Sequence, residues 1–207
     1  MPSTIKKLLE SVGLRADDVV SVRWGQAFDE TSPGIYFIST SSSIQTSEGI
    51  LPNAPVDESI LKFWNSKVKG IQIDGKYLSS SLQLKERLDK FWLPDENILY
   101  IGKADCIGGI TKRVNQYYKT EIGERKPHAG GHWIKTLSNL NDLYVHFVCC
   151  ESPLSVERSL LDCFLANVSS MSLLNHGDPL LPLPFANLEI DKRRRKKHGI
   201  NNCKLSK

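Results

Sequence analysis

Residues 97–118, NILYIGKADCIGGITKRVNQYY, constrain the fold more than any other part of the chain. Their first six residues are an apolar run typical of a strand, and a short loop with glycines follows. Residues 108–119 then repeat apolar side chains at helical spacing, with Arg113 and Tyr117 one turn apart on the same side. The segment therefore predicts a strand that turns directly into a helix. Lys103 lies near the start of that helix, where backbone N–H groups and a cation favour a phosphate.

Helices and strands are mixed along the rest of the chain. Apolar spacing predicts helices at residues 3–13, 57–68, 81–92 and 152–168, and strands at 18–24, 34–39 and 143–150. Asp74-Gly75 predicts a tight turn between two short strands. Residues 39–55 and HAGGHW at 128–133 are expected to be loops.

Composition favours an intracellular globular protein. No run of about 18 apolar residues is present, so we expect no transmembrane helix and no membrane partner. The first residues lack the apolar core of a secretory signal. The five cysteines are odd in number and none is spaced C-x-x-C, which argues against a disulfide framework and against a zinc knuckle. We therefore expect reduced thiols and a cytoplasmic location.

Positive charge is concentrated in two places. The net charge is +4, but residues 189–207 alone carry +6, and residues 98–135 carry +4. Such clusters suit a polyanion, so nucleic acid is the expected partner. The composition fits a solvated basic tail equally well. Within residues 191–207, Arg193, Arg194 and Arg195 are the candidate contacts to a DNA backbone.

One acidic residue stands out on the helix predicted at 152–168. Glu157 shares a face with Leu154, Leu161 and Phe164, and an unpaired carboxylate on an apolar stripe is costly. A partner is therefore expected, either a cation in an ordinary salt bridge or a metal ion. Mg²⁺ often needs only one or two protein carboxylates together with phosphate and water.

The ordered set of motifs resembles the GIY-YIG nuclease superfamily, in its restriction-endonuclease-like or uncharacterised bacterial branch. Gly34-Ile35-Tyr36 and Tyr100-Ile101-Gly102 carry the resemblance, followed by Lys103, Arg113, Tyr117 and Glu157. HAGGHW and LPFANLE at residues 183–189 also look like segments of some members. The resemblance implies an α/β (α+β) domain with a small three-stranded, mostly antiparallel sheet flanked by helices.

The resemblance also implies cleavage of DNA phosphodiesters with one divalent metal, Mg²⁺ or Mn²⁺. Glu157 would hold the metal, which would stabilise the leaving oxygen. Tyr36 would be the base for the attacking water, with Tyr100 and Tyr117 positioning the water or a phosphate oxygen. Arg113 and Lys103 would neutralise the phosphate. Gly102 would let the phosphate approach the backbone, Asn187 would hold the glutamate or the phosphate, and His128 would face the DNA.

The chain also departs from the usual family pattern. Residues 40–96 form an insertion between the first two core strands, so we expect an extension at 1–32, a nuclease domain at 33–190 and a basic tail at 191–207. Tyr117 stands where some relatives have histidine. Cutting both DNA strands would call for a homodimer on DNA or two encounters. The alternatives to a restriction or defence endonuclease are a nucleic-acid-binding protein on the same fold and a plain interaction module.

Overall fold

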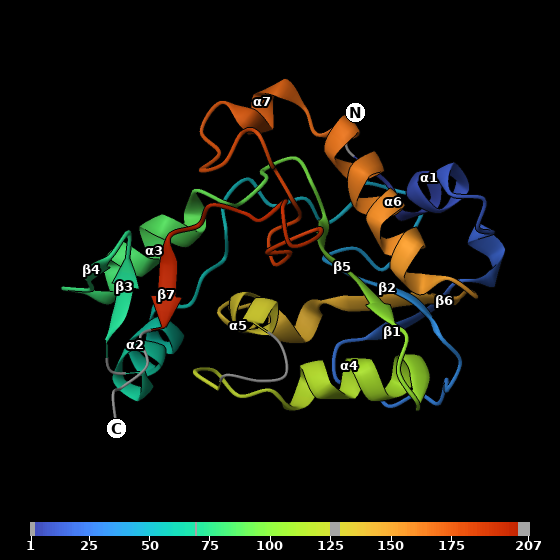
Figure 1. The fold of residues 1–207 in the computed structure, drawn as a ribbon, viewed down its shortest axis with the longest axis horizontal. Helices are drawn as coiled ribbons and strands as arrows, with labels where there is room; N and C mark the ends of the chain where they lie inside the picture. The colour runs from blue at the N-terminus through green and yellow to red at the C-terminus, as the bar shows by residue number, and fades with distance from the viewer. Residues whose placement is uncertain (1–2, 69, 125–128, 203–207) are drawn as a thin grey trace.

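A computed structural model describes residues 3–68, 70–124 and 129–202 as a mixed α+β protein with two antiparallel sheets (Figure 1). The larger sheet has the strand order β1-β6-β2-β5, and the smaller has the order β4-β3-β7. In the larger sheet, the strands are β1 (Val20–Arg23), β2 (Gly34–Ser39), β5 (Ile98–Ala104) and β6 (Tyr144–Cys149). β2 and β5 pair antiparallel, with Tyr36 opposite Gly102 and Ile38 opposite Tyr100.

The expectation of a three-stranded main sheet was wrong. β1, which lies in the predicted N-terminal extension, pairs with β6 as a fourth strand, with Val20 opposite Phe147 and Arg23 opposite Tyr144. The four residues of β1 are mostly exposed, so they carry a weak signal of sheet membership. Their partner β6 is mostly buried and rich in apolar side chains, and its burial stabilises the pairing.

Helices cover both faces of the main sheet (Figure 1). Side chains alternate along β2, so Ile35 and Phe37 pack with α1 (Ile5–Ser11) and α6 (Pro153–Asn167), whereas Tyr36 and Ile38 face α4 (Gly109–Lys119). Thr4 caps α1 by accepting a hydrogen bond from the Lys7 N–H. Pro153 begins α6. The first N–H groups of a helix have no partner within it, so the missing N–H of proline costs no hydrogen bond there.

The predicted insertion forms the second part of the molecule. It contains α2 (Glu58–Lys67), β3 (Ile71–Ile73), β4 (Lys76–Tyr77) and α3 (Ser81–Asp89), and Asp57 caps α2 through the N–H groups of Ser59 and Ile60. The expected turn at Asp74-Gly75 joins β3 to β4, with positive φ at both residues. Leu61, Trp64, Leu84 and Leu88 pack into the same core as Tyr36 and Ile38.

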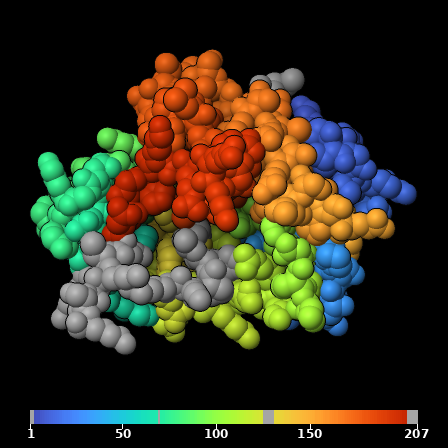
Figure 2. Space-filling model, viewed as in Figure 1, coloured from blue at the N-terminus to red at the C-terminus, as the bar shows by residue number. Residues whose placement is uncertain are grey.

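The C-terminal basic segment is folded, in contrast to the expected tail. β7 (Ile200–Asn202) pairs with β3, so the end of the described chain completes the small sheet. Figure 2 shows this segment between α6 and the elements of the insertion.

The segment HAGGHW contains a helix rather than the expected loop. α5 (Ala129–Lys135) forms because Trp133 and Ile134 are buried and the His132 ring is held at both nitrogens. Its Nδ1 accepts from the Gly123 N–H at 3.2 Å, and its Nε2 donates to the Glu124 carbonyl. Burial and these bonds outweigh the low helix propensity of two glycines. The remaining elements are α7 (Ser170–Leu173) and two 3-10 turns, Ala16–Asp18 and Leu140–Asp142.

Among the described residues, no helix is both long and apolar enough to cross a bilayer.

Candidate active site

Three tyrosines meet between the main sheet and α4. Tyr36 and Tyr100 lie diagonally across the paired strands, with ring centroids 5.7 Å apart. Tyr117 extends from α4 and brings its ring to 5.2 Å from that of Tyr100. The sequence motifs on β2, β5 and α4 are therefore gathered around one ring, that of Tyr100.

Gly102 makes this arrangement possible, although in a different way from the one expected. A Cβ at this position would lie 2.4 Å from Tyr100 Cε1 and 2.7 Å from Tyr36 Cζ. The tyrosine rings therefore occupy the space that a side chain would need. The glycine admits the two rings, whereas the sequence-based expectation was that it admits a phosphate to the backbone.

Burial keeps all three phenols protonated near neutral pH. Tyr36 and Tyr117 are each 1% exposed, and burial raises the pKa of both well above the usual value of 10. Burial, together with the nearby Glu157 carboxylate, raises the pKa of Tyr100 to about 12. In the free protein these groups are suited to donating hydrogen bonds, and a proton-accepting role for Tyr36 would require nearby positive charge.

A cleft of about 590 Å³ opens beside Tyr100. Its wall includes Lys103 from β5, Arg113 from α4 and Glu157 from α6, together with Asn187 and the segment that follows it. Arg195 also lines the cleft, so five predicted site residues share it with Tyr100: three from β5, α4 and α6, and two from the segment that follows α7. Tyr36 and Tyr117 do not line the cleft, and their rings pack against that of Tyr100.

Glu157 is half-buried in this cleft and has no fixed partner. Burial raises the pKa of its carboxyl to about 7, while attraction to Lys103 and Arg113 acts in the opposite direction. Within the described residues, neither a hydrogen bond nor an ion pair reaches this carboxylate. The partner expected from the sequence is therefore not supplied by a nearby protein side chain.

The two cations of the cleft have different attachments. Lys103 forms an ion pair with Asp105, at the end of the same strand. Arg113 is half-buried and donates from Nη1 to Gln116 Oε1 at 3.3 Å, a long hydrogen bond. The Arg113 guanidinium makes no ion pair within the described residues, so it can receive an anion.

Asn187 holds the edge of the main sheet. Its Oδ1 accepts from the Ile101 N–H at 2.9 Å, and its Nδ2 donates to the Ile101 carbonyl at 2.7 Å. β5 is an edge strand, and these two groups of Ile101 point away from β2. The side chain therefore replaces a neighbouring strand, whereas the sequence-based expectation placed it on the glutamate or the phosphate.

The three arginines predicted to contact DNA are not equivalent. Arg194 is tied to Asp162 and Asp191, and Arg195 lies 2.8 Å from a Glu189 oxygen. Arg193 is exposed and has no ion pair within the parts of the chain that the structure describes. The fourth predicted contact, His128, lies outside the described residues.

Lys196 supports the site in a way that the sequence did not indicate. It is 4% exposed, and its Nζ donates to the carbonyls of Pro184 and Phe185 at 2.9 Å each. Its ammonium also lies 5.1 Å from the Trp133 ring centroid. Lys196 thus fixes the loop that carries Asn187, and a run of six basic residues gives no signal that one of them is internal.

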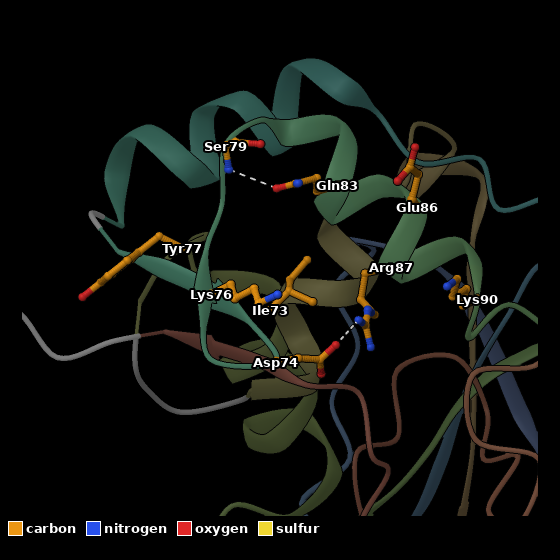
Figure 3. A pocket seen from close by; sticks show the side chains of 9 residues that line it. All are labelled: Ile73, Asp74, Lys76, Tyr77, Ser79, Gln83, Glu86, Arg87 and Lys90. Carbon is orange, nitrogen blue, oxygen red and sulfur yellow. Dashed lines mark hydrogen bonds and ion pairs between the residues drawn. The ribbon is translucent and has the colours of Figure 1, made fainter.

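A second hollow of about 420 Å³ lies between the β3–β4 hairpin and α3 (Figure 3). Asp74 and Arg87 form an ion pair inside it, and the Ser79 N–H donates to Gln83 at 3.0 Å. Tyr77 points away from the hollow in Figure 3. Its central charges are already paired, so the cleft at Glu157 is the better candidate for chemistry.

The donor set of the cleft suits a hard divalent cation held by few protein ligands. Glu157 offers an uncommitted carboxylate, and burial raises its pKa although Lys103 and Arg113 act in the opposite direction. Among the described residues, no cluster of three or more metal-binding side chains exists, so a metal held entirely by the protein is not supported. A metal shared with phosphate and water is compatible with the cleft.

No protein-family model, no curated protein and no solved structure matches this chain.

Proposed function

We propose that the protein is a divalent-metal-dependent DNA endonuclease that hydrolyses phosphodiester bonds in the cleft at Glu157. The observation that carries the proposal is the convergence of Tyr100, Arg113 and an unpartnered Glu157 on one open cleft. A half-buried carboxylate without a partner is destabilising, and such groups are retained where they act on a ligand.

Each side chain has a role that follows from its position. Arg113 presents a planar fork to the phosphate and stabilises the charge that develops during attack by water. Lys103 adds positive charge at the mouth of the cleft when the phosphate competes with Asp105 for its ammonium. Tyr100 donates its hydroxyl proton in a hydrogen bond to the water or to a phosphate oxygen.

Tyr36 and Tyr117 act through Tyr100. Both are buried and in ring contact with it, so they fix its orientation in the cleft. The base role that the resemblance implies for Tyr36 would need its phenol to lose its proton and to reach the cleft, so we assign Tyr36 the support of Tyr100 instead.

Glu157 would hold the metal, Mg²⁺ or Mn²⁺, as its protein ligand. When bound, such an ion supplies charge stabilisation to the phosphate and its leaving oxygen. Glu157 must lose its proton to bind a cation, and attraction to Lys103 and Arg113 assists that loss.

The test is cleavage of supercoiled plasmid with Mg²⁺ or Mn²⁺, with and without EDTA. We expect the wild type to nick or linearise the plasmid, and Glu157→Gln and Arg113→Ala to lose at least about 100-fold in rate. Glu58→Gln, an exposed residue in the first turn of α2, is the matched control and should retain activity.

The outcomes separate the alternatives. Equal cleavage by wild type and Glu157→Gln would contradict the assigned site. Plasmid binding without cleavage in every variant would identify a nucleic-acid-binding protein on this fold. Discrete linear products would support a restriction-type enzyme that acts on both strands as a homodimer on DNA, whereas nicked circles alone would indicate one cleft acting once.

A further inference from the structure

Ile107 is the most exposed large apolar side chain among the described residues. Its exposed fraction is 93%, compared with 86% for Leu180 and 75% for Leu174. It lies in the turn between β5 and α4, the connection that carries Lys103 at its start and leads to Arg113. Ile107 therefore makes almost no contact with the protein, so the fold does not explain an isoleucine here.

The turn holds Ile107 in a fixed place. The Gly109 N–H donates to the Cys106 carbonyl at 2.9 Å, which closes a four-residue turn. Gly108 has φ 92° and ψ 6°, the values of the third position in a type II turn, so Ile107 occupies the second position at the tip.

The far end of the turn is anchored to the segment that precedes β2. A Cβ on Gly109 would lie 2.2 Å from the Thr31 carbonyl oxygen, so the two backbones are in close contact. The next N–H, that of Ile110, donates to the Ser32 carbonyl at 3.2 Å, and the N–H of Thr111 donates to the Glu30 carbonyl at 2.9 Å. These contacts fix the backbone of the turn, so the exposed side chain of Ile107 has a defined position.

A cation lies beside this tip. The side chain of Lys112 is exposed and crosses Gly108, with its Cδ 2.9 Å from where a Cβ on that glycine would lie. Lys103 precedes Ile107 by four residues, so their Cα atoms are at most about 14 Å apart. Lys103 pairs with Asp105, so these two charges cancel and Lys112 supplies the net positive charge beside the tip. An apolar tip with a cation beside it matches a duplex, in which phosphates flank a stack of bases.

We propose that Ile107 is a wedge that inserts between two base pairs beside the phosphate held in the cleft. Apolar side chains inserted in this way partly unstack a base step and kink the duplex. The inserted side chain loses its contact with water, and Lys112 neutralises a neighbouring phosphate. The wedge rests on the proposed function, and it makes Ile107 a positioning residue that sets which base step lies next to Arg113 and Glu157.

The wedge is tested on plasmid DNA without a known recognition sequence. A closed circular plasmid is relaxed by a metal-independent topoisomerase in EDTA with the full-length protein bound, and the linking number is then read on a gel. An inserted wedge untwists the duplex and shifts the distribution. Duplex binding is measured in parallel by fluorescence anisotropy.

Three variants make the result specific to Ile107. Ile107→Ser should lower the linking-number shift per bound protein about twofold or more and weaken duplex binding about tenfold. Ile107→Leu keeps an apolar wedge and should behave like the wild type. Leu180→Ser removes a comparably exposed apolar side chain elsewhere and should change neither quantity.

The outcomes distinguish the wedge from the endonuclease. Duplex binding and metal-dependent cleavage by the wild type without a linking-number shift would overturn the wedge alone. The same conclusion would follow if Ile107→Ser gave the wild-type shift. Absence of duplex binding by the wild type would overturn the proposed DNA partner and the wedge with it. A circular-dichroism spectrum unchanged in Ile107→Ser confirms that the fold is intact.

Discussion

Replacement of Asn187 by alanine provides a quantitative test of how the site is built. Asn187 is 4% exposed, and its side chain satisfies both the N–H and the carbonyl of Ile101, which is itself fully buried. Asn187→Ala leaves these two backbone groups unpaired on the free edge of β5. A buried polar group that loses its partner costs about 1–3 kcal/mol, so we expect a loss of roughly 2–5 kcal/mol in the free energy of unfolding.

The neighbouring hydrogen bond limits this loss. The Ala186 N–H donates to the Leu99 carbonyl at 2.9 Å, so the loop stays attached to β5 at a second point. Asn187→Asp keeps an acceptor for the Ile101 N–H but directs a carboxylate oxygen at the Ile101 carbonyl. We expect this variant to be at least as unstable as Asn187→Ala at neutral pH.

Urea denaturation followed by tryptophan fluorescence measures both effects, with Asn53→Ala at an exposed position as the control. A contrary result would be an Asn187→Ala protein that unfolds at the wild-type urea concentration but has lost cleavage. Asn187 would then act on the phosphate, as the family resemblance implied, and the edge contact would be energetically neutral.

Three further predictions concern single side chains. Gly102→Ala would place a Cβ 2.4 Å from the Tyr100 ring, so we expect about 1–3 kcal/mol of destabilisation and a changed near-ultraviolet circular-dichroism spectrum; unchanged values would contradict the packing. Burial raises the pKa of Glu96 from 4.5 to about 8, so its protonated form stabilises the fold fully below pH 4.5, and this contribution is lost as the pH rises through 8. Relative to the wild type, Glu96→Gln should therefore become more stable as the pH rises from about 5 to 8, by on the order of 4 kcal/mol at pH 8. Thermal melts of both proteins at several pH values measure this, and a difference that does not change with pH would contradict it. Arg193→Ala should reduce the salt dependence of duplex binding by about one counterion. Arg194→Ala breaks two ion pairs and should mainly lower the free energy of unfolding, by about 1 kcal/mol. If both variants changed the salt dependence of binding equally, this difference between the two arginines would be refuted.

Local patterns predicted the elements of the site well. The spacing of Ile110, Val114 and Tyr117 identified α4, and Pro153 marked the start of α6. The proximity of Tyr36 and Tyr100 was an implication of the family resemblance, and in the structure it follows from the pairing of β2 with β5, which makes the two side chains diagonal neighbours. These predictions succeeded because each depends on contacts within an element or across one strand pair.

Contacts between distant segments were not predictable in this way. The pairing of β1 with β6 and the pairing of β7 with the equally short β3 join segments far apart in the chain. The pairing of Asn187 with Ile101 joins a side chain to backbone groups 86 residues away. Every residue has such backbone groups, so no residue type at position 101 could signal the partner.

The basic segment shows why charge counting overestimates a nucleic-acid surface. Residues 192–197 are all lysine or arginine, yet their surroundings divide them. The Lys196 N–H donates to the Leu188 carbonyl, and the Ile190 N–H donates to the Arg194 carbonyl, so the chain folds back on itself here. That fold turns Lys196 into the core, where burial lowers its pKa, and brings Arg194 and Arg195 against acidic side chains. Cations without such partners are the ones that release counterions when a phosphate binds, so under the proposed function we expect the salt dependence of DNA binding to follow the pairing of each side chain rather than the net charge of the segment.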